Sequence, residues 1–351
     1  MSFLLSIFHL SLFFSLCKGS GYDPVISSDF PDPSILRIGG KRYALLPQLT
    51  FGRNYPLSLI IRRGFPDDQT WTLTNIDALP VLGSWATSGK TWAPDVLQRS
   101  DGTFVMYYTA PNASSISHRV GTATSTSPTG PYTPQSTPLA CADSGGGALD
   151  PAGFQGEDGM HWVVYKVDGN ALGGGGPCGN DDGSHSTPIH LQRLADDAVT
   201  PVGDPVTILD RSEADGPAIQ GPSLIKRNGL YVLSFSSNCV NTLLFDTSYA
   251  TATSISGPYT KAAIPLLVTG QFGLTAPGGA DLALDGNSMV FHGNVGSGRG
   301  MYTAQLSWNG NVATVQPRKQ HFLEVVMYPP QKLDRQGNRK MEAILQKVRN
   351  S

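Results

Sequence analysis

Three short segments of the sequence combine carboxylates with proline at the start of an apolar, strand-like run. Aspartates can take a proton from water or orient a group that donates one, so several on converging strands would form a catalytic centre. A single Asp beside Pro is more often a turn residue, but the pattern recurs in three successive parts of the chain. The segments are SSDFPDPSIL at 27–36, with Asp29 and Asp32, TWAPDVLQR at 91–99, with Trp92 and Asp95, and GGALDPAGF at 146–154, with Asp150.

Regular repeats indicate how these segments are brought together. Five turn glycines precede strand-like runs such as SDGTFVMYYTA and RNGLYVLSFSS, and successive glycines are 57 to 70 residues apart. Asp-Gly and Asn-Gly supply the positive φ angles of tight hairpins. Five such units predict an all-β fold, a five-bladed β-propeller with four-stranded blades whose inner strands converge on the axis; an array of β-sandwiches is the alternative. The glycines are Gly40, Gly102, Gly159, Gly229 and Gly286.

The predicted propeller domain extends over residues 21–317. Residues 1–20 form an apolar run ending in small residues, which favours a cleaved secretory signal peptide, with a buried N-terminal strand as the alternative. No other stretch approaches the ~18 apolar residues of a membrane span, so a secreted, extracellular protein is expected. Residues 318–351 are charged and partly helix-forming. We expect a disordered or helical C-terminal extension there, or an artefact of the gene model, without a chemical role.

The overall charge argues against some classes of partner. Only 15% of the residues are charged, and the formal net charge is −2. No basic cluster is present that would bind nucleic acid. This balance suits an uncharged substrate such as a carbohydrate.

Three cysteines remain after the predicted signal peptide, which suggests one disulfide and one free thiol in an oxidising compartment. Cys141–Cys178 is the expected pair because both lie in loop-like segments, and Cys239 is then left over. Asn112 begins an Asn-Ala-Ser sequon, which favours a glycosylated surface loop. The Gly-rich run 169–184 lacks the Gly-Lys-Ser/Thr ending of a phosphate loop, which leaves a flexible loop near the substrate or a disordered segment.

Five ordered motifs resemble those of glycoside hydrolase family 43, the five-bladed propeller enzymes that act on arabinan and xylan. The resemblance extends over about residues 22–308. It implies an inverting O-glycosyl hydrolase that cleaves arabinofuranosyl or xylosyl linkages in plant cell-wall polysaccharide, with neither nucleic acid nor a membrane as partner. The motifs are DFPDPSIL, WAPDV, LDPAGF, GPSLIKRNGLYVLSFS and FHGNVGSGRGMYTAQL.

The resemblance also implies roles for individual residues. Asp32 matches the general base, which activates water, and Asp150 matches the carboxylate that orients the acid and raises its pKa. Inversion needs a base and an acid about 6.5–9.5 Å apart to admit the water, and a further negative charge keeps the acid protonated.

Four further residues are expected to contact substrate. Arg299 matches an active-site arginine, and Asp95 lies beside Trp92, which either stacks on a sugar or is buried in the core. His292 matches an axial histidine that the family associates with a central calcium ion through the ion's hydration shell. A hydrogen-bonded core residue is the alternative for His292, because calcium takes mainly oxygen ligands. No cofactor is required for the reaction, and a structural calcium at the axis is the one metal considered.

One position departs from the family pattern. The general acid of the family is a Glu directly before a Gly-Pro or Ala-Pro pair, and the segment AIQGPSLIK has Gln220 there. Glutamine can donate a hydrogen bond but cannot transfer a proton, and loss of a general acid costs about 10²–10⁴ in rate. Glu213 or Asp215, a few residues upstream, is considered as a replacement for the missing general acid. Poorer candidates are Glu157, His185 and His190.

Two functions therefore remain open. The first is a hydrolase impaired at Gln220, and the second is a carbohydrate-binding pseudoenzyme on the same propeller. A fructan-acting β-fructosidase ranks last because its Asn-Asp-Pro-Asn, Arg-Asp-Pro and Glu-Cys motifs are missing from the sequence.

Overall fold

The protein is represented by a computed structural model that describes residues 22–45, 58–62, 71–87, 91–115, 117–296 and 298–316. This part of the chain forms β-strands joined by loops and short 3₁₀ helices. The predicted signal peptide and C-terminal extension lie outside the described residues. Within them, no helix is long and apolar enough to cross a membrane.

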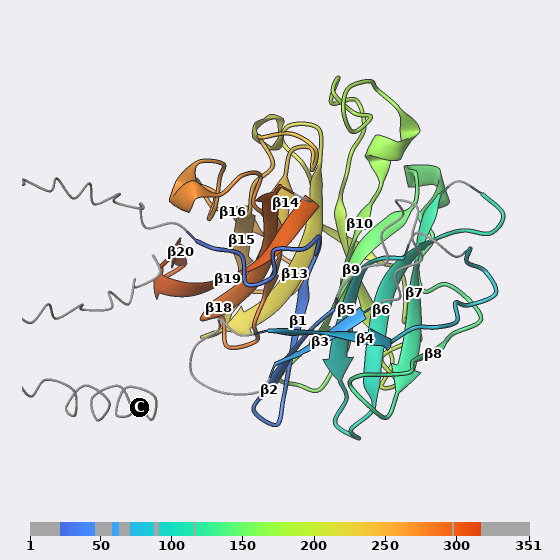
Figure 1. The fold of residues 1–351 in the computed structure, drawn as a ribbon. Helices are drawn as coiled ribbons and strands as arrows, with labels where there is room; N and C mark the ends of the chain where they lie inside the picture. Colours follow the sequence, from blue (N-terminus) through green and yellow to red (C-terminus); the bar gives the residue numbers. More distant parts are fainter. Residues whose placement is uncertain are drawn as a thin grey trace, which may run out of the picture. The chain divides into compact units, whose positions relative to one another are not determined.

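The strands form five antiparallel four-stranded sheets, each built from consecutive strands (Figure 1). The first comprises β1 (Ser34–Ile38), β2 (Lys41–Leu45), β3 (Ser58–Arg62) and β4 (Thr72–Asp77). The second comprises β5 (Trp92–Gln98), β6 (Phe104–Pro111), β7 (His118–Ser125) and β8 (Thr133–Pro134). The third comprises β9 (Ala148–Gln155), β10 (His161–Val167), β11 (Ile189–Leu194) and β12 (Val206–Leu209).

The remaining sheets follow the same plan. The fourth comprises β13 (Ile219–Arg227), β14 (Leu230–Ser237), β15 (Ser248–Ala252) and β16 (Thr260–Lys261). The fifth comprises β17 (Gly278–Leu282), β18 (Ser288–Val295), β19 (Gly298–Asn309) and β20 (Val312–Val315). The 3₁₀ helices of the described residues are η1 (Asp143–Gly145), η2 (Gly169–Leu172), η3 (Glu213–Asp215) and η4 (Gln271–Gly273).

The first strands of the sheets lie around a common axis. β1 contacts β5, β5 contacts β9, β9 contacts β13, β13 contacts β17, and β17 contacts β1 again. This cyclic order is that of a β-propeller, in which the inner strands surround the axis and the sheets extend outward. The predicted all-β propeller fold is confirmed.

Hairpins join the first and second strands of every sheet at the turn glycines found in the sequence. All five have positive φ, between 66° and 88°. At Gly102, Gly159 and Gly229 an added Cβ would meet nothing within 4 Å. Backbone conformation rather than lack of space therefore requires glycine there, since side chains disfavour positive φ.

Apolar side chains fill the spaces between adjacent sheets. Phe104, Met106 and Tyr108 of β6 pack with Leu36 and Tyr43 of the first sheet. A second cluster joins the third and fourth sheets in the same way. Strands that are buried on both faces are apolar along their whole length, whereas strands with one face in solvent alternate between apolar and polar residues. Burial between sheets therefore explains the apolar strand runs of the sequence.

The segment at 22–30 closes the ring of sheets. The main-chain N–H groups of Val25 and Ile26 donate to the oxygen of Met301 in β19, at 2.8 and 3.3 Å, and Met301 donates back to Ile26 at 2.9 Å. The Tyr22 ring contacts that of Phe272 edge to face. The start of the described chain is therefore joined to the last sheet before it enters β1.

The predicted disulfide was wrong. Cys178 pairs with Cys239, and Cys141 is free. Cys178 follows η2 and Cys239 follows β14, and these segments belong to adjacent sheets, so the propeller brings them together. The loop that carries the sequon is exposed at Ala113 and Ser114, as expected, but Asn112 itself is 7% exposed and donates its Nδ2 to Ser115 Oγ at 2.9 Å, which disfavours glycosylation.

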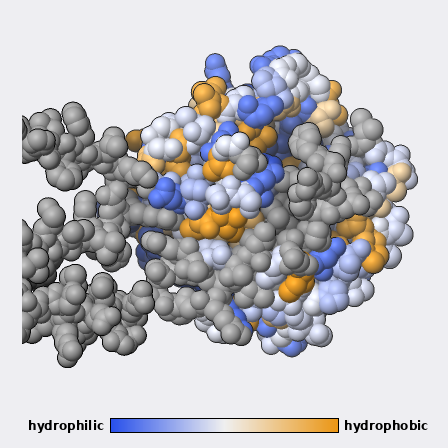
Figure 2. All heavy atoms as spheres, in the orientation of Figure 1, coloured by the Kyte–Doolittle hydropathy of each residue, from blue (hydrophilic) through white to orange (hydrophobic). Residues whose placement is uncertain are grey.

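On the face drawn in Figure 2, hydrophilic and hydrophobic residues are interspersed. Exposed large hydrophobic residues include Leu243, Leu244 and Ile264 in loops of the fourth and fifth sheets.

Candidate active site

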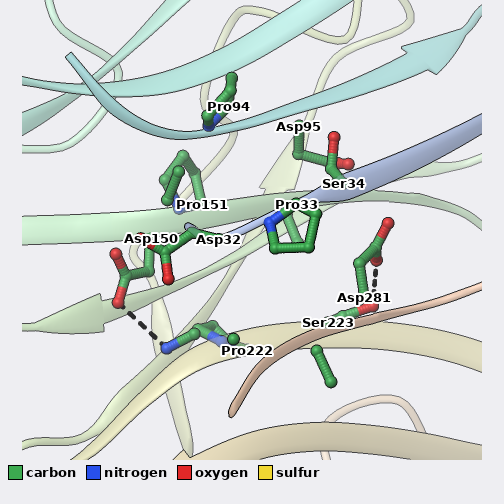
Figure 3. Close-up of a pocket in the computed structure, with 15 residues that line it drawn as sticks. Asp32, Pro33, Ser34, Pro94, Asp95, Asp150, Pro151, Pro222, Ser223 and Asp281 are labelled. Atoms are coloured by element: carbon green, nitrogen blue, oxygen red, sulfur yellow. Dashed lines mark hydrogen bonds between the residues drawn. The ribbon is translucent and has the colours of Figure 1, made fainter. Parts of the chain in front are cut away.

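A residue of positive φ lies at or near the start of each first strand, and these residues line one axial pocket (Figure 3). Their φ angles lie between 43° and 60°. Aspartate tolerates this region better than most side chains, and strain of this type is characteristic of functional sites. The pocket is lined by residues 32–34, 93–95, 150–152, 221–223 and 279–281. The five positive-φ positions are Asp32, Ala93, Asp150, Gly221 and Gly279.

Asp32 is held at the pocket by two residues of the fifth sheet. Its main-chain N–H donates to His292 Nδ1 at 3.0 Å, and its Oδ2 lies 3.6 Å from Arg299 Nη1. Burial opposes ionisation of Asp32, but the charge of Arg299 and the hydrogen bond to His292 lower its pKa to about 2. Its side chain remains 30% exposed to the pocket. Asp32 is thus an ionised carboxylate that water can reach.

Asp29, His292 and Arg299 lie close to Asp32 in the structure. His292, on β18, is fully buried, and its ring stacks on that of Phe245. Arg299, on β19, donates its main-chain N–H to Asp29 Oδ1 at 2.8 Å. Asp29 therefore positions the arginine rather than lining the pocket.

Asp150 lies across the same pocket from β9. Its main-chain N–H donates to Thr109 Oγ1 at 3.0 Å, and its Oδ2 accepts a hydrogen bond from Gly221 N at 3.0 Å (Figure 3). Burial, and next the charge of Asp32, raise the pKa of Asp150 to about 7, although Lys166 opposes the rise. Asp32 and Asp150 therefore differ strongly in their tendency to hold a proton.

Gln220 immediately precedes the glycine that Asp150 contacts. It is half-buried on β13, and its Nε2 donates to the main-chain oxygen of Asn238 at 3.0 Å. A register shift in the β13–β14 pairing follows Gln220, so its backbone turns at the pocket. Asp32 and Asp150 thus line one pocket at the axis, and Gln220 directly precedes the lining residue Gly221.

Neither substitute acid is placed at the pocket. Asp215 is 7% exposed and accepts hydrogen bonds from Ser212 N and Oγ, both at 2.6 Å, in a capping box of η3. Lys261 Nζ also contacts this carboxylate. Glu213 is exposed on η3, and the residues lining the pocket include neither Glu213 nor Gln220. The structure thus engages Asp215 in other contacts and leaves the replacement of the acid by Glu213 a prediction.

Asp95 and Asp281 form a second, deeper pair of carboxylates. Asp95 Oδ2 accepts from Gly153 N at 2.7 Å, which links β5 to β9. Asp281 accepts from Ile35 N and from Ser223 Oγ, both at 2.7 Å, which links β17 to β1 and β13. Burial raises both pKa values, that of Asp95 to about 8, with the charge of Asp281 adding to the rise, and that of Asp281 to about 6. These carboxylates tie the first strands together.

A buried lysine beside Asp150 was not found from the sequence. Lys166, 1% exposed on β10, donates Nζ to Asp168 Oδ1 at 3.1 Å and to Asn170 Oδ1 at 2.6 Å. Its positive charge lowers the pKa of Asp150. A lysine inside the apolar run HWVVYKV was the available signal, because a charged residue is rarely buried without partners.

Trp92 lies at the start of β5, beside the pocket residue Ala93. It is half-buried, and its ring stacks on that of His118, with 4.2 Å between centroids. His118 was not found from the sequence, where it stands alone at a strand start. The two rings form an aromatic pair next to the pocket, a surface of the kind that stacks on sugars.

The donors around His292 do not fit a directly bound calcium ion. His292 Nδ1 contacts Asp32 through the main-chain N–H at 3.0 Å and through Oδ1 at 3.3 Å, so this nitrogen is not free to bind a cation. Burial lowers the pKa of His292, which favours the neutral ring. Its Nε2 is buried without a hydrogen-bond partner in the described residues. Nor do these residues contain a cluster of three or more His, Cys, Asp or Glu side chains suited to a metal.

Comparison with known proteins places the chain among glycosidases. The sequence model described as "Glycosyl hydrolases family 43" matches residues 22–311. An extracellular endo-α-(1→5)-L-arabinanase of Bacillus subtilis is 26% identical over 280 residues, which cover 74% of this chain and 79% of that protein. A β-D-galactofuranosidase of Aspergillus niger is 26% identical over 254 residues, which cover 68% of this chain and 65% of that protein.

Solved structures share the fold. The crystal structure of a thermostable family-43 glycoside hydrolase has a TM-score of 0.67 at 24% identity, covering 82% of this chain and 96% of that one. A native Bacillus subtilis arabinanase has a TM-score of 0.63 at 23% identity, covering 82% and 98%. At these identities the likeness shows a common propeller architecture.

Proposed function

The chain belongs to family 43 of the glycosyl hydrolases, and from this premise we propose that it is an inverting hydrolase of arabinofuranosyl or xylosyl linkages in plant cell-wall polysaccharide. The observation that carries the proposal is the pair Asp32 and Asp150 in one pocket, with pKa values of about 2 and about 7. Two carboxylates whose environments separate their pKa values are typical of acid–base sites. We count the five four-stranded sheets as the five blades.

Asp32 is the general base in this mechanism. Ionised at neutral pH, it takes a proton from a water molecule as that water attacks the anomeric carbon. Arg299 and His292 keep Asp32 ionised and fix its orientation. Trp92, backed by His118, is proposed to stack on a sugar ring, and Asp95 supports the pocket wall.

Gln220 stands on the leaving-group side, where it donates a hydrogen bond but no proton. Asp150 holds the adjacent Gly221 in place and retains its role of orienting whatever group occupies position 220. The departing oxygen must then leave as an anion or take a proton from solvent. Natural linkages are consequently cleaved slowly, whereas nitrophenyl glycosides, with good leaving groups, are affected least.

Hydrolysis of nitrophenyl α-L-arabinofuranoside and of arabinan by the purified protein tests the proposal. Weak but measurable release of nitrophenol is expected, with arabinan cleaved far more slowly, and proton NMR of the first product shows the inverted anomer. Asp32→Asn serves as the control, because it preserves the shape of the side chain and removes the base. Activity that survives this substitution at the same rate would contradict the assignment.

A carbohydrate-binding pseudoenzyme is the second candidate, and the bond between Gln220 and Asn238 favours it. An amide engaged in this way keeps the pocket ordered without any acid chemistry. Calorimetry that shows oligosaccharide binding, together with no turnover of either substrate, would select this function.

We propose that the protein is secreted and needs no cofactor. A disulfide is typical of an oxidising compartment, and the Bacillus subtilis arabinanase is named as extracellular. An axial calcium would be held only through its water molecules, near His292. Equal activity before and after treatment with a chelator is therefore expected.

A further inference from the structure

The Gly-rich loop, which we define as residues 173–184, is fastened to the segment that follows β14. Cys178 forms a disulfide with Cys239, and Asn241 Nδ2 donates to Pro177 O at 3.1 Å. In Figure 1 this yellow-green segment extends beyond the end of β10. The covalent link therefore crosses from the third sheet to the fourth.

Further contacts give the Gly-rich loop a defined conformation. Asn180 is fully buried, and its Nδ2 donates to His185 O at 2.8 Å and to Pro217 O at 2.7 Å. Arg211 Nη1 donates to Gly183 O at 2.9 Å. At Gly179, with φ of 87°, an added Cβ would lie 2.4 Å from Asn170 O, so only glycine permits this close approach.

The same loop is connected to the surroundings of two residues of the proposed reaction centre, Gln220 and Asp150. Asn238, the residue before Cys239, accepts the hydrogen bond of Gln220. Asn170 donates Nδ2 to Cys178 O at 3.0 Å and accepts from Lys166 Nζ, the lysine beside Asp150. A change in the position of Cys178 is thereby transmitted to the surroundings of residues 220 and 150.

In an inverting hydrolase the acid position lies on the side of the departing sugar, opposite the water and the base. A wall beside Gln220 therefore faces the sugar unit that leaves. We propose that the Gly-rich loop, held in place by Cys178–Cys239, is a specificity-determining wall for that leaving-group sugar. This inference rests on the proposed function, and it assigns to the disulfide a task beyond folding stability.

Binding of two ligands separates this role from a general effect on the fold. Calorimetry compares arabinose, which fills one sugar position, with an arabinotriose that spans the cleavage point. In Cys178→Ser/Cys239→Ser the dissociation constant of arabinotriose is expected to rise about five- to tenfold, because the released loop must be ordered again on binding. Arabinose affinity is expected to change less than twofold. Cys141→Ser is the matched control, with both affinities unchanged.

If the double variant binds both ligands equally less tightly, or binds arabinotriose as tightly as the original protein, the inference is overturned and the proposed function is left intact. If the unaltered protein binds neither ligand, the proposed function itself fails, and the inference fails with it. Asn241→Ala, which removes one bond to the loop and keeps the disulfide, covers the case of a double variant that does not fold. This variant is expected to raise the dissociation constant of arabinotriose alone, by about twofold. An unchanged arabinotriose affinity would contradict the proposal that the Gly-rich loop contacts the leaving-group sugar.

Discussion

The side-chain amide of Gln220 donates a hydrogen bond to the main-chain oxygen of Asn238 at 3.0 Å. A carboxylate in the same place would face that oxygen with its own negative charge, and only the protonated acid can donate to it. The surroundings of position 220 therefore favour a neutral donor, which is the state in which a general acid must wait for its substrate. The surroundings of this glutamine are suited to the acid that the chain lacks.

Gln220→Glu is thus expected to create a carboxyl group with a raised pKa, held by Asn238 and close to Asp150. Turnover of natural arabinan should rise at least tenfold, since a missing general acid typically costs about 10²–10⁴ in rate. Nitrophenyl α-L-arabinofuranoside should gain much less. The measurement is kcat on both substrates for the original and altered proteins.

Glu213→Ala provides the counterpart for that experiment. It is expected to leave both rates unchanged, because Glu213 is exposed on η3, whereas Gln220 is half-buried beside Gly221, the residue that Asp150 contacts. If Gln220→Glu has no effect and Glu213→Ala abolishes activity, a displaced acid operates and the interpretation of Gln220 is wrong.

Asp32→Asn should change the titration of Asp150 as well as the reaction rate. The negative charge of Asp32 contributes to raising the Asp150 pKa to about 7, so its removal should lower that pKa. Carbon NMR of labelled aspartate carboxyl groups measures the shift, with Asp150→Asn identifying the signal. Hydrolysis should fall by about 10²–10⁴ in the same variant. An Asp150 pKa that stays the same or rises would show that the two carboxylates do not interact.

The hairpins and the pocket aspartates were predictable because their signals are local. A turn glycine reports the positive φ of its own residue and an Asp-Pro pair marks a turn, and neither signal depends on distant partners. The repeat then places the starts of the first strands at one axis, which brings Asp32, Asp150 and Gln220 together without knowledge of any contact.

The parts that were missed depend on contacts between sheets. Cys178 and Cys239 meet because adjacent sheets carry them, which neither cysteine's flanking sequence indicates. Lys166 lies in an apolar strand, and its partners are in the following loop. Asp95 was noticed because Pro94 precedes it. Asp281 follows Gly279 and Ala280, with no neighbouring proline to mark it. Glycine supplies the positive φ at that strand start instead.

Asp95 is expected to make the protein less stable as the pH rises toward 8. Its folded-state pKa, about 8, exceeds the ordinary value of 3.8. Between these values the unfolded chain has lost a proton that the folded chain retains, so the free energy of unfolding falls with increasing pH. Asp95→Asn retains an oxygen acceptor for Gly153 N and removes this proton linkage. Its melting temperature should therefore exceed that of the original protein by several degrees at pH 8, and by less as the pH falls.

The pH of the comparison supplies the control for Asp95→Asn. Near pH 4 the carboxyl group is neutral in the folded protein, so the two melting temperatures should nearly coincide. A difference in melting temperature that is the same at pH 4 and pH 8 would mean that packing, not proton binding, explains the effect.

Lys166→Met should raise the pKa of Asp150 and destabilise the fold. The lysine charge opposes the rise of the Asp150 pKa, and its loss leaves Asp168, 6% exposed, without its ion-pair partner. Breaking a buried pair in this way typically costs about 3–5 kcal/mol. Urea unfolding measures the loss of stability, and carbon NMR of the Asp150 carboxyl measures its pKa. The double variant Lys166→Met/Asp168→Asn should recover much of the stability, because the uncompensated charge is gone. If Lys166→Met alone unfolds at the same urea concentration as the original protein, Asp168 does not depend on the lysine.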